Sequence, residues 1–321
     1  MEISKPLPCI GICGVGQMGT GLVTCFKRAG FQVYVWDQNE ARLSSFMTDV
    51  GELESWMDRH VGPAKSKEGS ASAAELNSLD ETVDVLIECV AEDLSQKVEL
   101  LRRFAKCKNR QAIFLSVTSG LSITEMGQLS GCGPLLVGTH FWNPPHLMPL
   151  VEVIPGRQAS PDVTDRVCDL VEAIGKLPIR LRRDVPGFIG NRLVHALWRE
   201  AIHIVEQGIA TAEEVDFVAK MTLGLRLAAV GPLENIDLVG LDLVEKIHQY
   251  LLSDLAKNAG PSRFLQSMLH EGKLGQKSGQ GFYDWHRRDA GNLIRERDKN
   301  IVRQLQLVQA GSDTPPQETK S

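Results

Sequence analysis

Short apolar runs alternate with helical patterns through the first half of the chain. Four runs have the length and composition of buried strands: residues 9–13, 32–36, 84–89 and 112–116. Between them, apolar residues recur at helical spacing over 17–29 and 94–105. Strands that alternate with helices are typical of βαβ units, so this half predicts a parallel sheet.

Two further apolar runs, at 135–139 and 150–154, are expected to extend the same sheet. A polar segment separates the second strand from Asp84. Its middle, KSKEGSASAAEL at 65–76, has the small and polar residues of a loop, so we predict a loop there.

After Asp184 the apolar residues follow helical spacing, and strand-like apolar runs no longer alternate with helices. Apolar residues follow helical spacing from 188 to 207, ahead of a helix stop at Gly208, and again over 213–221 and 243–256. The predicted fold class is therefore α/β, with a Rossmann-like parallel-sheet domain at 1–184 and a mainly α-helical domain at 185–310. The polar, proline-containing tail at 311–321 is expected to be disordered.

The net charge and the cysteines indicate which partners and which cellular compartment to expect. The net charge of −5 argues against nucleic acid or an anionic membrane as a partner, and no stretch is long enough to span a bilayer. The seven cysteines form no Cys-x-x-Cys pair, and their odd number argues against a disulfide framework. The first eight residues do not resemble a signal peptide, so we expect a cytoplasmic protein with reduced thiols.

A glycine-rich turn follows the first predicted strand and precedes a helix, in the spacing Gly14-x-Gly16-x-x-Gly19. Such a turn lets a pyrophosphate approach the backbone at a helix N-terminus. The alternative is an ordinary glycine turn inside a core. The residues of this turn expected to bind the cofactor are Gly14, Gly16, Gln17, Met18 and Gly19.

Asp37 ends the next predicted strand and completes the pattern of a dinucleotide-binding fold. Its carboxylate would accept hydrogen bonds from the adenosine ribose hydroxyls and would repel a 2′-phosphate. The predicted cofactor is therefore NAD rather than NADP.

Glu152 stands alone inside the apolar run at 150–154, where a carboxylate is costly unless it has a partner. The candidate partner is His140, which two successive strands could bring beside it. A carboxylate bonded to one imidazole nitrogen leaves the other free to take a proton from an alcohol as hydride leaves. A purely structural carboxylate is the alternative. The other histidines show no metal-ligand spacing, so no metal site is expected.

Several motifs in order now point to one family. They are GVGQMG, ECVAEDLSQK, TSGLSI, HFWNPP, LVEVI, DVPGFIGNR, GPLENIDLVGLD and KSGQGFYDW. Over residues 9–285 the chain resembles the L-3-hydroxyacyl-CoA dehydrogenase superfamily, which includes free-acid relatives such as lambda-crystallin/L-gulonate dehydrogenase and carnitine dehydrogenase.

The resemblance implies four catalytic residues. His140 matches the catalytic base, and Glu152 matches the residue that orients it. Ser119 matches a serine that bonds the substrate oxygen, and Asn191 matches an asparagine that polarises the same oxygen. Ser119 could instead be only a turn residue, and Asn191 an ordinary polar residue early in a helix.

The resemblance also implies further cofactor contacts. Asn143 matches a contact to the nicotinamide carboxamide, and Lys277 matches a residue that closes over the cofactor. Glu92 and Lys97 match residues that flank the nicotinamide half, but they could equally be a surface pair on a helix, which would contribute little.

Three departures from the CoA-dependent members bear on the substrate. The segment after the second strand is shorter than their lysine-rich hairpin and carries Asp49, Glu52, Glu54 and Asp58, whereas CoA would favour a basic surface. Arg226, before a Gly-Pro, could bind a free substrate carboxylate or could be a surface or interface arginine. Val117 replaces a typical asparagine next to the oxygen pocket.

The predicted activity is NAD-dependent oxidation of an L-3-hydroxyl, with a free 3-hydroxy acid slightly favoured over a CoA thioester as the small-molecule substrate. One alternative is a non-catalytic NAD-binding protein, crystallin-like or sensory. Another is a β-hydroxyacid dehydrogenase, which uses a lysine base on the interdomain helix, but 188–207 contains no lysine. The apolar stretches at 227–244 and 247–252 favour a homodimer, unless they form an internal core.

Overall fold

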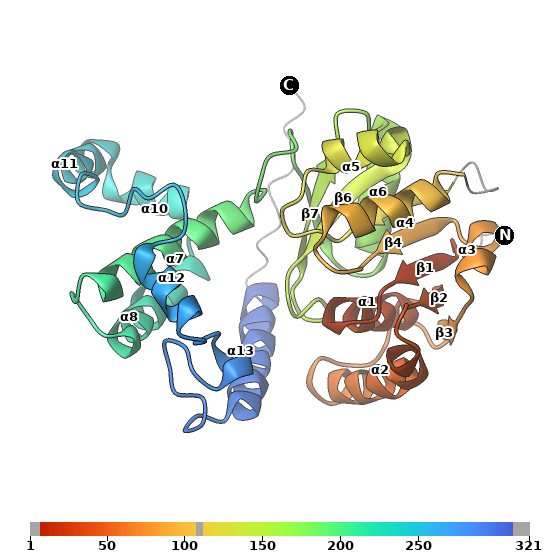
Figure 1. Ribbon diagram of the computed structural model, residues 1–321, viewed down its shortest axis with the longest axis horizontal. Helices are drawn as coiled ribbons and strands as arrows, with labels where there is room; N and C mark the ends of the chain where they lie inside the picture. The colour runs from red at the N-terminus through yellow and green to blue at the C-terminus, as the bar shows by residue number, and fades with distance from the viewer. Residues whose placement is uncertain (1–6, 107–111, 311–321) are drawn as a thin grey trace. The chain divides into compact units, whose positions relative to one another are not determined.

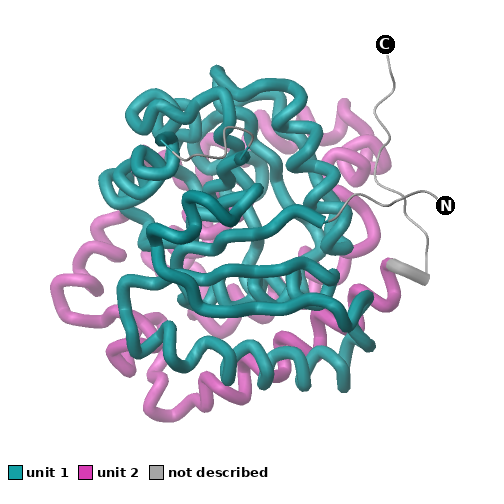
Figure 2. The backbone as a smooth tube through the Cα atoms, turned by 90° about the vertical axis from the view of Figure 1, so that its right-hand side faces the viewer, with its two compact units in different colours: residues 1–192 teal, residues 193–321 magenta. Residues whose placement is uncertain are grey.

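The computed structural model describes residues 7–106 and 112–310 (Figure 1). The chain divides into two compact units, 1–192 and 193–321 (Figure 2). The division falls in the first turn of the helix that begins at Gly190, slightly after the predicted boundary at Asp184. The predicted disordered tail at 311–321 lies outside the described residues.

Unit 1 is built on an eight-stranded sheet in the order β3-β2-β1-β4-β5-β6-β7-β8. The strands are β1 (Ile10–Cys13), β2 (Gln32–Trp36), β3 (Ser70–Ala73), β4 (Val85–Glu88), β5 (Ile113–Ser116), β6 (Leu136–Phe141), β7 (Leu150–Pro155) and β8 (Leu177–Arg180). The helices are α1 (Gln17–Arg28), α2 (Glu40–His60), α3 (Leu76–Thr82), α4 (Leu94–Phe104), α5 (Ile123–Ser130), the short η1 (Gly133–Leu135) and α6 (Pro161–Ala173).

Helices cover both faces of this sheet. Residues of α1, α2 and α6 form one apolar cluster with the strands, and residues of α3, α4 and α5 form the other. Strands β1, β4, β5 and β6 are buried along their whole length. Burial on both faces explains why they read as continuous apolar runs rather than as alternating ones.

The sheet is parallel except between β6 and β7, which are antiparallel. The prediction of a parallel sheet is therefore wrong for this pair. A parallel connection needs a crossover of about a dozen residues or more, and only the short segment from Trp142 to Pro149 joins β6 to β7. The antiparallel register sets His140 directly opposite Glu152.

The edges of the sheet differ most from the sequence prediction. The predicted loop at 65–76 contains β3, which pairs with β2 in parallel. At the other edge, β8 pairs with β7 and was not predicted. Both edge strands are short and largely unburied, so neither has the apolar run on which strand prediction relies.

Unit 2 is helical, as predicted. Its elements are α7 (Gly190–Glu206, of which Gly190–Arg192 belong to unit 1), α8 (Ala212–Val218), the π-helical η2 (Ala219–Gly224), α9 (Leu225–Leu227), α10 (Pro232–Val239), α11 (Leu241–Leu251), α12 (Arg263–His270), η3 (Gln276–Ser278) and α13 (Ala290–Ala310). The helix predicted over 188–207 is α7, and Gly208 follows it with φ of +67°. The helix predicted over 243–256 is shorter, because α11 ends at Leu251. Within the part of the chain that the structure describes, no helix combines the length and apolar character needed to cross a bilayer.

Candidate active site

The glycine-rich turn connects β1 to α1, at the point where the sheet order reverses between β1 and β4. Gly14 has φ of +103°, and a Cβ there would lie 2.6 Å from the Cys89 carbonyl oxygen. A Cβ on Gly19 would lie 1.9 Å from the Gly14 carbonyl oxygen. Both positions therefore require glycine for packing within the protein.

Gly16 lacks a side chain for a different reason. A Cβ at this position would meet no heavy atom of the protein within 4 Å. The space next to Gly16 is therefore open at the N-terminus of α1, where backbone N–H groups favour an anion. The turn fits a dinucleotide pyrophosphate.

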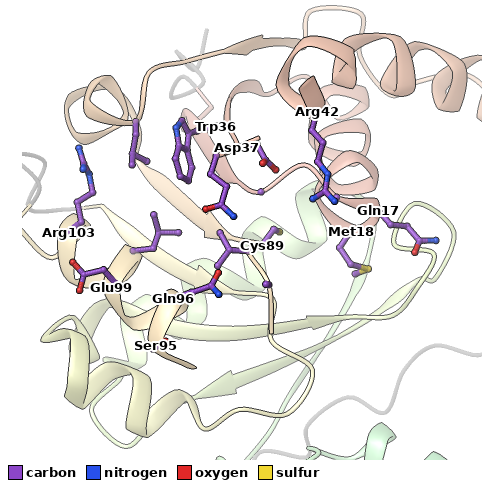
Figure 3. A pocket seen from close by; sticks show the side chains of 17 residues that line it. Gln17, Met18, Trp36, Asp37, Arg42, Cys89, Ser95, Gln96, Glu99 and Arg103 are labelled. Carbon is purple, nitrogen blue, oxygen red and sulfur yellow. The ribbon is translucent and has the colours of Figure 1, made fainter. Parts of the chain in front are cut away.

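A cavity of about 910 Å³ opens beside this turn (Figure 3). It is lined by five of the predicted cofactor residues: Gly14, Gly16, Gln17, Met18 and Asp37. It is also lined by residues that the sequence did not single out, among them Trp36, Arg42, Leu76, Gln96 and Arg103. Arg42 lies on the same side of the cavity as Gln17 and Met18.

The Asp37 carboxylate is buried and already holds two backbone groups. One oxygen accepts a hydrogen bond from the Val15 N–H at 2.8 Å, and the other accepts from the Asn39 N–H at 2.8 Å. These bonds fix the carboxylate at the wall of the cavity, and its remaining lone pairs can accept from hydroxyl groups. A fixed negative charge there favours NAD over NADP.

His140 and Glu152 form a buried pair between β6 and β7. The Nδ1 atom of His140 lies 2.7 Å from Oε2 of Glu152, and the two side chains are 4 % and 2 % exposed. The prediction that neighbouring strands bring these residues together is confirmed. The partner expected for the lone carboxylate is therefore present.

The second oxygen of Glu152 holds the start of α7. It accepts hydrogen bonds from the backbone N–H groups of Ile189 at 2.8 Å and Gly190 at 3.1 Å. Burial alone would raise the pKa of Glu152, but the bonds from His140 and these two amides hold that pKa below its usual value. Glu152 is therefore ionised at neutral pH and can only accept hydrogen bonds.

Two aromatic rings enclose His140. The ring of Trp142 lies 5.0 Å away and that of Phe188 lies 5.5 Å away, measured between centroids. Phe188 is buried with φ of +53°, a conformation that is strained for a residue with a side chain. A Cβ on Gly190 would lie 2.1 Å from the Trp142 ring, so this helix start requires glycine.

Ser119 and Asn191 are joined to each other. The Asn191 side-chain Nδ2 donates to the Ser119 carbonyl oxygen at 2.6 Å. Asn191 directly follows the two residues whose amides bind Glu152. The structure therefore links His140, Glu152, Asn191 and Ser119 into one local arrangement.

Glu92 and Lys97 are not a surface pair. Glu92 precedes α4, whose N-cap is Asp93, so it does not lie on the helix as expected. Its Oε1 accepts from the Ser119 N–H at 2.8 Å and from the Thr118 hydroxyl at 2.5 Å. Lys97 is 1 % exposed, and its Nζ lies 3.3 Å from Oε2 of Glu92.

Lys97 has a second carboxylate partner, which was not predicted from the sequence. Its Nζ lies 2.8 Å from Oε1 of Glu88, a fully buried residue at the end of β4. Glu88 stands in an apolar run just as Glu152 does, so the same signal could have revealed it. Neither Glu92 nor Lys97 lines the cavity beside the glycine-rich turn.

The remaining predicted residues are Asn143, Arg226 and Lys277. Asn143 is exposed in the connection after β6. Arg226 is exposed in α9, and Lys277 lies in η3, where it lines an apolar cavity of about 520 Å³ within unit 2. Their roles stay predictions. Within residues 7–106 and 112–310, no group of three or more acidic, histidine or cysteine side chains could hold a metal ion.

Comparison with known proteins identifies the family. Residues 9–185 match the 3-hydroxyacyl-CoA dehydrogenase NAD binding domain, and residues 187–285 match the C-terminal domain of the same family.

Relatives and solved structures agree with this assignment. The chain is 31 % identical to 5-formyl-3-hydroxy-2-methylpyridine 4-carboxylate 5-dehydrogenase of Mesorhizobium japonicum, over 91 % of this chain and 96 % of the relative. It is 33 % identical to a probable 3-hydroxybutyryl-CoA dehydrogenase of Bacillus subtilis, over 89 % of this chain and 98 % of the relative. A crystal structure described as that of the former activity, an NAD⁺-dependent dismutase, superposes with a TM-score of 0.89 at 29 % identity, covering 95 % and 99 % of the two chains. The chain therefore belongs to the 3-hydroxyacyl-CoA dehydrogenase family, with an NAD-binding domain followed by a helical C-terminal domain.

Proposed function

We propose that the chain oxidises an L-3-hydroxyl group to a 3-oxo group, with His140 as the general base. The observation that carries this proposal is the buried bond between His140 Nδ1 and Glu152 Oε2. An ionised Glu152 can only accept, so Nδ1 must carry the proton and Nε2 must present its lone pair. Nε2 would then take the proton of the substrate hydroxyl, and Glu152 would stabilise the imidazolium that forms.

Ser119 and Asn191 are proposed to hold the substrate oxygen. Asn191 is fixed by its bond to the Ser119 carbonyl, and Nδ2 keeps a second N–H that can point at the substrate. The Ser119 side chain is exposed and can bond the same oxygen. Donors aimed in advance at a developing charge stabilise the transition state without reorganisation.

The cofactor would bind along the glycine-rich turn and the cavity beside it, with Asp37 on the adenosine ribose. When bound, NAD supplies the acceptor for the hydride. The enclosed setting of His140, between Trp142 and Phe188, limits the access of water to the proton-transfer step.

For the substrate, we favour a free 3-hydroxy acid over a CoA thioester. Two relatives at similar sequence identity have names that refer to different substrates, a pyridine carboxylate and a CoA thioester. Sequence identity therefore does not decide between a free acid and a thioester. The acidic face of α2 favours the free acid. Two of its four carboxylates, Glu54 and Asp58, form ion pairs with Lys27 and Arg28 of α1, whereas Asp49 and Glu52 stay exposed and would repel a CoA phosphate.

Arg226 is proposed to bind the substrate carboxylate, because a guanidinium can hold a carboxylate with two parallel hydrogen bonds. The Arg226→Glu change should raise the KM for a free acid about tenfold or more, the loss expected for a charge-assisted hydrogen bond. Arg303→Glu, on the exposed side of α13, is the matched control. An unchanged KM in Arg226→Glu would remove this role.

A panel of substrates tests the proposed function directly. Purified protein would be mixed with NAD and either L-3-hydroxybutyryl-CoA or free L-3-hydroxy acids, and NADH formation followed. Turnover of free acids supports the proposal in full, and turnover of the thioester alone would remove the preference for a free acid. NAD binding with no turnover of any hydroxy compound would favour the non-catalytic alternative.

We also propose a homodimer formed through unit 2. Exposed leucines in the stretch at 227–244 support an interface there: Leu233, Leu238 and Leu241 are 75 %, 77 % and 66 % exposed in the single chain. An apolar surface of this kind marks an interface in many proteins. Leu238→Glu should shift the mass in solution toward the monomer, whereas Leu129→Glu on α5 of unit 1 should not.

A cytoplasmic location is proposed from the six free cysteines among the described residues.

A further inference from the structure

Glu88 is a buried carboxylate that takes no part in the proposed proton transfer. It ends β4, is fully buried, and has three hydrogen-bond partners. Oε1 accepts from Lys97 Nζ at 2.8 Å and from the Val90 N–H at 2.8 Å, and Oε2 accepts from the Ser116 hydroxyl at 2.6 Å. Such a group is costly to bury, and its full set of partners indicates a specific role.

Lys97 lies between the buried carboxylate of Glu88 and the more exposed carboxylate of Glu92. Its ammonium has three donors, and three acceptors surround it: Glu88 Oε1 at 2.8 Å, the Val90 carbonyl at 3.1 Å and Glu92 Oε2 at 3.3 Å. Every donor of Lys97 is therefore matched within unit 1. The lysine bridges a buried carboxylate and a half-exposed one.

Glu92 connects Lys97 to the loop that carries Ser119, one of the residues proposed to hold the substrate oxygen. Its other oxygen, Oε1, accepts from the Ser119 N–H and from the Thr118 hydroxyl. Ser119 in turn accepts from Asn191 through its carbonyl oxygen. A continuous series of polar contacts thus runs from the interior of the sheet to both residues that are expected to hold the substrate oxygen.

We propose that Glu88 is a positioning residue: by holding the Lys97 ammonium against Glu92, it fixes the loop that carries Ser119 and, through the Ser119 carbonyl, the Asn191 amide. The expected effect of Glu88 on the reaction rests on the proposed function, whereas its expected effect on the Ser119 loop does not. Without the Glu88 carboxylate, the buried ammonium loses its nearest anion and would move. Glu92 would then be held by the loop alone.

The Glu88→Gln variant tests this role, with Ser116→Ala as the matched control. The control removes one hydrogen bond from the same carboxylate but leaves its contact with Lys97. Amide hydrogen exchange in peptides spanning 112–122 reports the Ser119 N–H without any substrate. We expect that amide to exchange about tenfold faster or more in Glu88→Gln, and no such change in Ser116→Ala.

Kinetics supply the second comparison. In Glu88→Gln, kcat should fall about tenfold or more, whereas Ser116→Ala should keep a kcat near that of the wild type. The double variant Glu88→Met/Lys97→Met covers the case in which Glu88→Gln does not fold, since an apolar pair can replace a buried ion pair with little loss of stability. It should show the same faster exchange at Ser119.

The outcomes separate the two proposals. Unchanged Ser119 exchange in Glu88→Gln and in the double variant, or a uniform rise in exchange along the whole sheet, would overturn the positioning role. A wild-type chain that turns over no hydroxy compound would sink the proposed function alone, because the exchange comparison would still decide whether Glu88 holds the Ser119 loop.

Discussion

Glu152 joins His140 to the N-terminus of α7. One of its oxygens lies 2.7 Å from His140 Nδ1, and the other accepts from the amides of Ile189 and Gly190. A single carboxylate therefore sets the tautomer of the proposed base and fixes the helix start that carries Asn191. The position of the acid–base group and that of the oxygen-polarising group thus depend on one side chain.

Replacing Glu152 by glutamine should reduce catalysis far more than binding. The amide can donate to Nδ1, which would place the histidine proton on Nε2 and leave no lone pair for the substrate. We expect kcat to fall about 10²- to 10⁴-fold, the range for loss of a general base, with the Kd for NADH little changed. Glu172→Gln, an exposed position on α6, is the control for a carboxylate change at the surface.

The same carboxylate should make folding stability depend on pH. Because the pKa of Glu152 is lowered in the folded protein, its contribution is fully present above the ordinary value of 4.5 and is lost as pH falls through the lower folded value. Chemical denaturation from neutral pH down to acid should show a smaller loss of unfolding free energy in Glu152→Gln than in the wild type. Identical slopes in the two proteins would contradict the lowered pKa.

Adding a methyl group at Gly190 should disturb the helix start. The new Cβ would lie 2.1 Å from the Trp142 ring, so either the ring or the amides that bind Glu152 must move. We expect Gly190→Ala to cost about 1–3 kcal/mol of unfolding free energy and to lower kcat. Gly51→Ala, within α2, meets no atom within 4 Å and should be neutral or stabilising. Equal stability of the two variants would show that the contact with Trp142 has no effect.

The glycines of the nucleotide turn should separate folding from cofactor binding. Gly16→Ala should keep the wild-type Tm but weaken NADH binding, because its Cβ enters space that the protein leaves open. Gly19→Ala should lower the Tm, because its Cβ would meet the Gly14 carbonyl at 1.9 Å. Thermal unfolding and NADH fluorescence titration check the pair. Normal NADH binding by Gly16→Ala would place the pyrophosphate elsewhere.

Much of this arrangement was predictable from the sequence, because burial leaves a signal. The central strands are apolar along their length, and a lone carboxylate among apolar residues pointed to the pair of Glu152 with His140. The pattern failed where that signal is absent. Strand β3 consists of small residues, and β8 has only four residues, one of them a proline and one an arginine. The sequences of β6 and β7 do not indicate that the two strands are antiparallel, and only the short connection between them does.

Long-range contacts explain the rest of what was missed. The sequence allowed Lys97 to be either a cofactor contact or a member of a surface pair, and only the folded structure shows its ion pair with the buried Glu88. The strain at Phe188 and the contact between Gly190 and Trp142 are likewise invisible until both segments are placed.

The most direct test of the account compares wild-type protein with His140→Gln in NAD reduction by free L-3-hydroxy acids and by L-3-hydroxybutyryl-CoA. Both proteins would first be titrated with NADH to establish that the cofactor site is intact. The account predicts equal NADH binding and a fall in kcat of about 10²-fold or more in the variant. Turnover by His140→Gln at the wild-type rate would contradict it, because another group would then have to take the proton.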